Sequence, residues 1–240
     1  MPIMDFSVVL PVYNEAENLK RLVESLKDPF RQLGGSYEII CVDDGSTDDS
    51  QAVLVQLAQR FAEIRIVTFE VNCGQSAALA AGLQAAKGEI VATLDSDLQN
   101  DPQDIPHMVQ KIKEGNDFVC GVREKRQDTF SKRMASKIGN GVRRWFLRDH
   151  IIDTGCTLKV FRRHCISAFV YFKGAHRYFA VFAEKAGFKI AQVNVQHHAR
   201  HAGKSKYSNW RRGWDGLFDL MMVRQLLKRR IPYRIKNGTH

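Results

Sequence analysis

Along the first 120 positions, short continuous runs of apolar residues alternate with longer segments in which apolar residues recur every three or four positions. The short runs predict buried strands, and the periodic segments predict amphipathic helices. Strands that alternate with helices are typical of a mostly parallel sheet with helices on both faces and ligands at the carboxyl ends of the strands. We expect strands at residues 6–12, 37–42, 64–69, 89–94 and 117–122, and helices from residue 15 and at 48–61, 76–86 and 102–114.

The second half of the chain has a less regular pattern. It predicts a basic helix at 132–147, strands at 157–161 and 189–197, and a polar loop at 198–208. Apolar residues close to helical spacing predict a last helix at 210–229, which a basic segment ends. We therefore divide the chain into an α/β domain, residues 1–209, and a basic amphipathic C-terminal helix and tail, residues 210–240.

Two local features are expected to be structural. Asn14 is placed to cap a helix that begins at Glu15, with Glu17 completing a capping box. The aromatic residues between Phe169 and Phe182 are expected to lie in the core; the alternative is an apolar approach for a lipid chain.

Charge divides the chain into halves of opposite sign. Residues 1–120 carry 9 Lys and Arg against 19 Asp and Glu, a net charge of −10, whereas residues 121–240 carry 27 against 7, a net charge of +20. Clustered carboxylates can hold a cation, and clustered Lys and Arg can bind phosphate, nucleic acid or an anionic membrane surface. No RNA- or DNA-binding motif accompanies the basic half, so we expect no nucleic-acid partner.

Composition restricts the class of protein and its compartment. The 240 residues suffice for a full core, and 44% of them are hydrophobic, which is ordinary for a globular protein. Five cysteines without a C-x-x-C pair argue against a zinc site or a disulfide framework and favour a reducing compartment. No run of 18 apolar residues and no secretory segment is present, so we expect a cytoplasmic protein.

Acidic and aromatic residues follow three of the expected strands. Asp95 and Asp97 come directly after a buried strand, and Asp43 and Asp44 end another strand of the same sheet. Carboxylates are preferred ligands of Mg²⁺ and Mn²⁺, which usually complete their coordination with substrate phosphates. Both pairs can also be read as solvated turns that cap helices, although this leaves Asp44 unexplained; Asp44 and Tyr13 could contact a base or ribose.

Four segments in this order resemble glycosyltransferase family 2: VVLPVYNE at 8–15, VDDGSTD at 42–48, NCG at 72–74 and LDSDLQ at 94–99. The resemblance implies the GT-A fold, a Rossmann-like, mostly parallel sheet flanked by helices, and transfer of a sugar from a nucleotide-sugar. Further segments are similar to the polyprenyl-phosphate sugar transferases of this family, which include the dolichyl-phosphate mannosyltransferases and the undecaprenyl-phosphate 4-deoxy-4-formamido-arabinose transferases. These segments are residues 122–123, 126–128, 135–137, 153–156, 161–163, 197–200 and 203–208. The resemblance covers about residues 5–220.

The resemblance also implies roles for individual residues. Asp153, near the reacting carbon of the sugar, and Asp97 would be catalytic, and Mg²⁺ or Mn²⁺ would be bound by Asp95, Asp97 and Gln99. Arg123 and Arg133 would meet the acceptor phosphate. The donor, a UDP- or GDP-sugar, would be bound by Pro11, Tyr13, Glu15, Asp44, Asp95, Ser96, Arg200 and Lys206, the last two on a mobile loop.

The implied reaction is a displacement at the anomeric carbon with inversion, in which a polyprenyl phosphate attacks and a nucleoside diphosphate leaves. If the acceptor were an alcohol, a base would be needed, and Asp153 is the candidate. An enzyme of the same fold that acts on a soluble or protein acceptor and a nucleotidyltransferase remain as alternatives.

The proteins of this resemblance continue into transmembrane helices, whereas this sequence ends at His240. The segment from Arg200 to Lys236 is strongly basic, and its expected helix has an apolar stripe with Trp214, Phe218 and Met222. We expect this helix to lie on the anionic inner face of the cell membrane, so that the enzyme is peripheral. Alternatively, the stripe packs on the catalytic domain or a second subunit, or a partner membrane protein provides attachment.

Overall fold

The computed structural model of the 240-residue chain describes residues 4–123, 130–198 and 209–229. For residues 130–133, 135–137 and 209–215 it describes the backbone alone.

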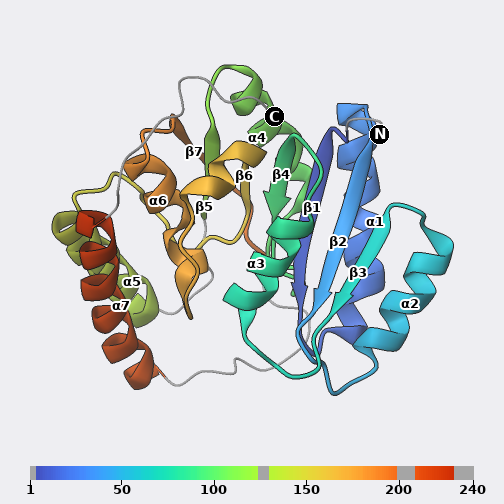
Figure 1. The fold of residues 1–240 in the computed structure, drawn as a ribbon, viewed down its shortest axis with the longest axis horizontal. Helices are drawn as coiled ribbons and strands as arrows, with labels where there is room; N and C mark the ends of the chain where they lie inside the picture. Colours follow the sequence, from blue (N-terminus) through green and yellow to red (C-terminus); the bar gives the residue numbers. More distant parts are fainter. Residues whose placement is uncertain (1–3, 124–129, 199–208, 230–240) are drawn as a thin grey trace.

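Within these ranges the strands form one seven-stranded sheet in the order β3-β2-β1-β4-β6-β5-β7 (Figure 1). The neighbours β3-β2, β2-β1, β1-β4 and β5-β7 are parallel, and β6 is antiparallel to both β4 and β5. The mostly parallel sheet expected from the sequence is confirmed. The strands are β1 Phe6–Val12, β2 Tyr37–Asp43, β3 Ile64–Thr68, β4 Ile90–Thr93, β5 Phe118–Arg123, β6 Lys159–Arg162 and β7 Ile190–Val195.

Helices cover both faces of the sheet, because the central strands are apolar on both sides. Side chains alternate along β1, so Val8 and Leu10 enter one core cluster and Val9 enters the other. The first cluster includes residues of α1, α2 and α4, and the second includes residues of α3, α5, α6 and α7. The α-helices are α1 Ala16–Leu33, α2 Ser50–Arg60, α3 Gln75–Ala85, α4 Ile105–Lys113, α5 Phe130–Leu147, α6 Phe179–Lys185 and α7 Asn209–Arg229, and 3-10 helices span Pro102–Asp104, Arg163–Ala168 and Ala175–Tyr178.

The aromatic cluster lies mainly in the second core, as expected. Phe169, Phe179 and Phe182 are 7%, 1% and 1% exposed, and the rings of Phe169 and Phe179 stack with their centroids 4.4 Å apart. Tyr171 is the more exposed member of the cluster. These rings therefore stabilise the packing of α6 against the sheet.

The expected cap of the first helix is wrong. Asn14 has a positive φ of 54°, and its Oδ1 accepts hydrogen bonds from the Thr47 and Asp48 backbone N–H groups at 2.7 and 3.3 Å. The Ala16 N–H at the start of α1 instead donates to Asp48 Oδ2 at 3.3 Å. A side chain from the next loop therefore caps α1, and Asn14 joins the two loops.

Candidate active site

Loops after β1, β2 and β4 meet at one edge of the sheet. The Asp44 N–H donates to the Val12 carbonyl oxygen at 2.8 Å, which links the ends of β2 and β1. Ser96 Oγ donates to the Pro11 carbonyl oxygen, also at 2.8 Å, which links the loop after β4 to β1. The carboxylate pairs Asp43-Asp44 and Asp95-Asp97 therefore lie along the same edge, as expected for neighbouring parallel strands.

Asp44 organises the segment of residues 72–74. Its carboxylate accepts hydrogen bonds from Asn72 Nδ2 and from the backbone N–H groups of Cys73 and Gly74, at 2.7 to 3.2 Å. Burial raises the pKa of Asp44, and the two backbone N–H groups oppose this rise. An ionised carboxylate has about four acceptor positions, and Asp44 already uses several of them for residues 72–74. A nucleoside that contacts Asp44 would therefore share its carboxylate with these residues.

Gly45 permits this close packing. Its φ is +65°, and a Cβ atom at this position would lie 2.5 Å from the Val71 carbonyl carbon. Only glycine accommodates both the left-handed backbone and the approach of the second chain segment.

Asp95, Asp97 and Gln99 line one pocket. Asp95 Oδ1 accepts a hydrogen bond from Gln75 Nε2 at 2.6 Å, and Asp97 Oδ1 accepts one from the Gln99 N–H at 3.1 Å. Leu98 has a positive φ of 59°, so the chain turns sharply between the second carboxylate and the amide. The residues around the pocket are Asp95, Asp97, Gln99, Asn100, Arg123, Gly155, Thr157 and His197.

The donor atoms of this pocket fit a hard divalent cation that a second ligand helps to bind. Among the described residues, no group of three or more His, Cys, Asp or Glu side chains is arranged to hold a metal by itself. Two carboxylates are nevertheless a usual protein contribution for Mg²⁺, which keeps water or substrate phosphate as its other ligands. Asp95 and Asp97, with Gln99 beside them, would therefore hold the ion together with a diphosphate.

Arg123, which also lines this pocket, is paired with Asp153. Arg123 Nε and Nη2 donate to Asp153 Oδ2 and Oδ1 at 2.7 and 2.8 Å, a bidentate geometry that fixes the orientation of both groups. Their side chains are 15% and 9% exposed, so water screens the pair weakly. Gly155 follows in the same turn, and a Cβ atom there would lie 2.8 Å from Arg123 Nη2.

Sequence reasoning did not foresee several residues of the pocket. Asn100 pairs with His197 through an isolated β-bridge, and Asn100 Nδ2 donates to Thr157 Oγ1 at 2.8 Å. His197 also lines the pocket. Asn100 directly follows the Asp95–Gln99 motif, and this adjacency could have identified it as a pocket residue. The pairing of Asn100 with His197 and Thr157 leaves no signal in the sequence.

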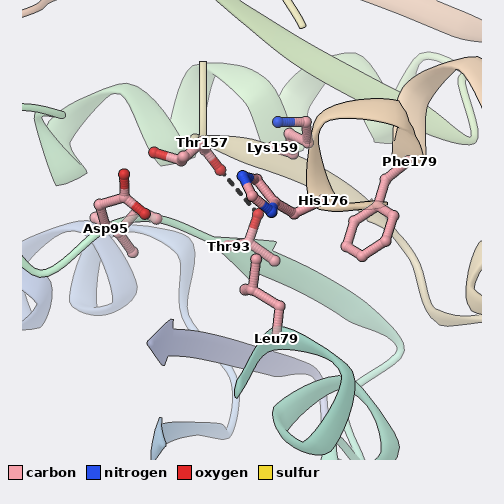
Figure 2. Close-up of a pocket in the computed structure, with 8 residues that line it drawn as sticks. Leu79, Thr93, Asp95, Thr157, Lys159, His176 and Phe179 are labelled. Atoms are coloured by element: carbon pink, nitrogen blue, oxygen red, sulfur yellow. Dashed lines mark hydrogen bonds between the residues drawn. The ribbon is translucent and has the colours of Figure 1, made fainter. Parts of the chain in front are cut away.

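A second hollow adjoins the first and shares Asp95 and Thr157 with it (Figure 2). Lys159 is buried, and its Nζ donates to the Cys156 carbonyl oxygen. Burial lowers the pKa of His176 to about 3, so the ring is neutral at pH 7. His176 Nδ1 lies 2.8 Å from Ser76 Oγ, which accepts the Gly174 N–H. The hydroxyl proton is thus suited to donate to Nδ1.

The remaining expected site residues are placed unevenly. Pro11, Tyr13 and Glu15 are partly exposed at the end of β1, and Glu15 Oε2 accepts a hydrogen bond from Asn18 Nδ2 at 2.7 Å. Arg200 and Lys206 lie outside the described residues, as does most of the loop at 198–208. Arg133 belongs to α5, and its side chain is outside the described part.

Comparison with known proteins identifies the family. Residues 7–178 match the family described as Glycosyl transferase family 2. The chain is 40% identical over 207 residues to undecaprenyl-phosphate 4-deoxy-4-formamido-L-arabinose transferase of Pectobacterium carotovorum subsp. carotovorum (strain PC1). This match covers 86% of the chain and 63% of the relative, so the chain spans less than two thirds of the relative's length.

Solved structures share the fold. Glucosyl-3-phosphoglycerate synthase from Mycobacterium tuberculosis, in complex with Mn²⁺ and UDP-glucose, superposes with a TM-score of 0.71 at 21% identity, covering 92% of this chain and 79% of that one. A further mycobacterial protein superposes with a TM-score of 0.69 at 21% identity, covering 92% and 74%. The match over residues 7–178, the 40% identical relative and the arrangement of the sheet agree: this chain belongs to glycosyl transferase family 2 and has the GT-A fold.

Proposed function

We propose that this enzyme transfers a sugar from a nucleotide-sugar to a polyprenyl phosphate, with inversion at the anomeric carbon. The observation that carries the proposal is that Asp95, Asp97, Gln99 and Arg123 line the same pocket. Carboxylates that can hold a cation suit a donor diphosphate, and a guanidinium suits an acceptor phosphate. The relative from Pectobacterium, whose name specifies an undecaprenyl phosphate, supports this acceptor class.

The donor would lie across the loops after β1, β2 and β4. Tyr13 and Glu15 would contact the nucleoside, and Asp44 would shape its pocket by holding residues 72–74. Ser96 would keep the loop of Asp95 and Asp97 against β1, since its hydroxyl group donates to the Pro11 carbonyl oxygen. Bound Mg²⁺ or Mn²⁺ would stabilise the charge that develops on the departing nucleoside diphosphate.

On the acceptor side, the attacking group needs positioning more than deprotonation. A phosphate monoester has a second pKa of about 6, so it is mostly dianionic at pH 7. One phosphate oxygen forms the new bond to the anomeric carbon as the bond from that carbon to the diphosphate oxygen breaks. Arg123 would orient this phosphate, because an arginine has five N–H donors and can serve Asp153 and a phosphate together.

Asp153 would hold Arg123 in place near the reacting carbon. For an alcohol acceptor it would instead have to accept a proton, and its bidentate pairing with Arg123 opposes that role. The geometry thus favours a phosphate acceptor over an alcohol acceptor.

We further propose that the enzyme works on the inner face of a membrane, which the exposed apolar surface of α5 and α7 contacts. None of the described helices is long and apolar enough to cross a bilayer. Helices α5 and α7 lie side by side (Figure 1), and Arg224 of α7 stacks over the Phe146 ring of α5 at 4.4 Å. Their exposed apolar residues, the α5–α7 face, are Met134, Ile138, Val142, Trp145, Leu217, Phe218 and Met221.

A nucleotide-release assay tests the proposed function. Purified protein with Mg²⁺ or Mn²⁺ is given UDP- or GDP-sugars, with undecaprenyl phosphate in detergent or with a soluble phosphate such as 3-phosphoglycerate. The proposal requires nucleoside diphosphate release that depends on the lipid phosphate, together with a glycolipid product. Nucleoside diphosphate release with the soluble phosphate, but not with the lipid phosphate, would show that the acceptor is soluble. Release of pyrophosphate would indicate a nucleotidyltransferase.

A further inference from the structure

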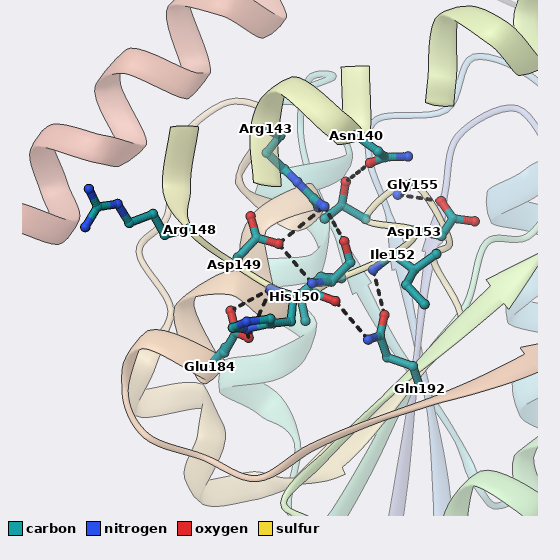
Figure 3. Close-up of polar contacts among 12 residues, drawn as sticks. Asn140, Arg143, Arg148, Asp149, His150, Ile152, Asp153, Gly155, Glu184 and Gln192 are labelled. Carbon is teal, nitrogen blue, oxygen red and sulfur yellow. Dashed lines mark hydrogen bonds and ion pairs between the residues drawn. The ribbon is translucent and has the colours of Figure 1, made fainter. Parts of the chain in front are cut away.

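The segment of residues 148–155, between α5 and β6, carries Asp153 and is bonded to the scaffold along its whole length (Figure 3). Lys185 Nζ donates to the Arg148 carbonyl oxygen at 2.6 Å, and the His150 N–H donates to Glu184 Oε1 at 3.1 Å. Gln192 of β7 accepts from the Ile152 N–H at 2.7 Å and donates to the His150 carbonyl oxygen at 3.0 Å. The path of the chain into Asp153 is thus set by side chains from two elements, α6 and β7.

Arg143 of α5 makes the most buried of these connections. Its Nη2 donates to the Ile151 carbonyl oxygen and lies 3.3 Å from Asp149 Oδ1, which also accepts the Ile151 N–H at 2.9 Å. The side chains of Arg143 and Asp149 are 7% and 0% exposed. The Arg143 guanidinium therefore holds the carbonyl group of Ile151 directly and its N–H group through Asp149. Ile151 lies two residues before Asp153.

This ion pair is incompletely satisfied. Among the described residues, Arg143 Nε and Nη1 and Asp149 Oδ2 are buried and have no hydrogen-bond partner. Desolvation disfavours both charges: it lowers the pKa of Arg143 and raises that of Asp149. Buried ion pairs with unmet hydrogen bonds are often no more stabilising than apolar residues of the same size. A gain in stability therefore explains the charges of Arg143 and Asp149 poorly. The fixed geometry that the pair gives to residues 149–153 is a sufficient explanation.

We propose that Arg143 is a positioning residue of the transfer site. Arg143 binds Asp149 and the Ile151 carbonyl group, and so fixes the conformation of the turn at Asp153. Through Asp153 it orients Arg123 toward the pocket of Asp95 and Asp97. This inference rests on the proposed function for its kinetic consequence, but its structural content, a loop fixed by Arg143, stands independently. A misplacement of about 1 Å in a transfer site can lower the rate about 100-fold.

The test replaces both charges so that neither is left buried alone. The Arg143→Met/Asp149→Asn enzyme keeps side chains of similar volume and an acceptor for the Ile151 N–H, but it loses the hydrogen bond to the Ile151 carbonyl oxygen. We expect a melting temperature within a few degrees of wild type, a donor KM within about twofold, and a kcat about 100-fold lower. Arg143→Lys, which restores a charged donor, should recover part of the lost kcat.

Hydrogen exchange supplies a readout that needs no reaction. Peptides that cover residues 149–155 should exchange faster in the double variant, and those of β1 and β2 should not change. Arg162→Met/Glu89→Gln is the control: Arg162 also bonds a carboxylate and a backbone carbonyl, in a more exposed pair beside the start of β4. The control should keep kcat and the protection of residues 149–155.

Unchanged exchange in residues 149–155, unchanged kcat, or an equal loss of kcat in the control would each overturn the proposal. If wild-type enzyme transferred no sugar to a lipid phosphate, the proposed function would fail separately. The exchange comparison would then still decide whether Arg143 fixes the loop.

Discussion

At the scale of single residues, two carboxylates at the same edge of the sheet differ in what their oxygens contact. Asp44 accepts hydrogen bonds from two backbone N–H groups of residues 73–74 and from Asn72 Nδ2. Asp97 lines the pocket, and its Oδ1 accepts a hydrogen bond from the N–H of Gln99, a residue of its own turn. Asp44 therefore holds the backbone of residues 72–74, whereas Asp97 lies in the pocket that we propose for a cation.

Replacing Asp97 should separate metal-dependent chemistry from folding. We expect Asp97→Ala to lower Mn²⁺- or Mg²⁺-dependent turnover at least about 100-fold, because lost stabilisation of several kcal/mol on the leaving diphosphate corresponds to at least that factor. The melting temperature should stay close to wild type. Asp101→Asn, a nearby carboxylate that accepts the Gln103 N–H, serves as the control. Near wild-type turnover of the Asp97→Ala enzyme would show that the metal assignment is wrong.

His176 should make the fold sensitive to acid. Its pKa is lowered to about 3 in the folded protein, mainly by burial, from about 6.5 when unfolded. Between these values the unfolded chain binds the extra proton, so the unfolding free energy falls as the pH drops below about 6.5. The loss is at most about 1.4 kcal/mol per pH unit, and it is smaller here because the residue stays partly accessible.

Urea unfolding at pH 7 and pH 5 measures this effect. His176→Gln, which can still bond Ser76 Oγ, should lose less unfolding free energy over this interval than wild type. Equal losses in the two proteins would contradict a neutral His176 in the folded protein.

At the scale of helices and strands, the spacing of apolar residues located the elements along the chain but did not show which side of each helix faces the core. The sequence placed a stripe of Trp214, Phe218 and Met222 on the last helix, and in the structure Phe218 is 65% exposed while Leu220 and Val223 enter the core. The exposed apolar side of α5, with Trp145 80% exposed, was not foreseen. The rotation of a helix about its axis depends on its neighbours, so apolar spacing alone does not say which apolar residues stay outside.

The α5–α7 face should bind anionic vesicles reversibly and in a salt-sensitive manner. Exposed Arg144, Arg148, Lys228 and Arg229 accompany it, and each basic residue near an anionic surface contributes about 1 kcal/mol. Sedimentation with phosphatidylserine-rich vesicles should recover the wild type at low salt. Ile138→Asp/Trp145→Asp should bind much more weakly.

Val55→Asp is the matched control, because Val55 is 46% exposed on the distant helix α2. Failure of the wild type to sediment even at low salt would overturn this face as a membrane contact and favour a partner membrane protein or a soluble acceptor.

At the scale of the whole molecule, the pocket lies between the two halves of the chain. Asp95 to Asn100 come from the acidic half, and Arg123, Gly155, Thr157 and His197 come from the basic half. The sequence motifs identified the first wall and, through the resemblance, Arg123 and Asp153. They could not show that β6 inserts antiparallel between β4 and β5, which brings Thr157 beside Thr93, because strand pairing distant in sequence leaves no local signal.

Donor and metal should stabilise the whole fold together. A ligand at 100 times its dissociation constant adds about 2.7 kcal/mol to the unfolding free energy, or about 5–10 °C in melting temperature for a protein of this size. We expect this shift with Mn²⁺ plus UDP or GDP, and a much smaller one with either alone. The nucleotide that produces the larger shift identifies the donor base. Equal shifts with and without Mn²⁺ would contradict a shared site.

Helix α5 has consequences for how this family member can vary in length. Its 18 residues present Ile138 and Trp145 outward and Arg143 inward, toward the turn of Asp153. One residue inserted between Ile138 and Arg143 would rotate Met134 and Ile138 by about 100° relative to Arg143 and Trp145. The helix therefore tolerates a changed side chain far better than an inserted residue, which would either turn Ile138 away from the outer face or turn the Arg143 guanidinium out of its buried position.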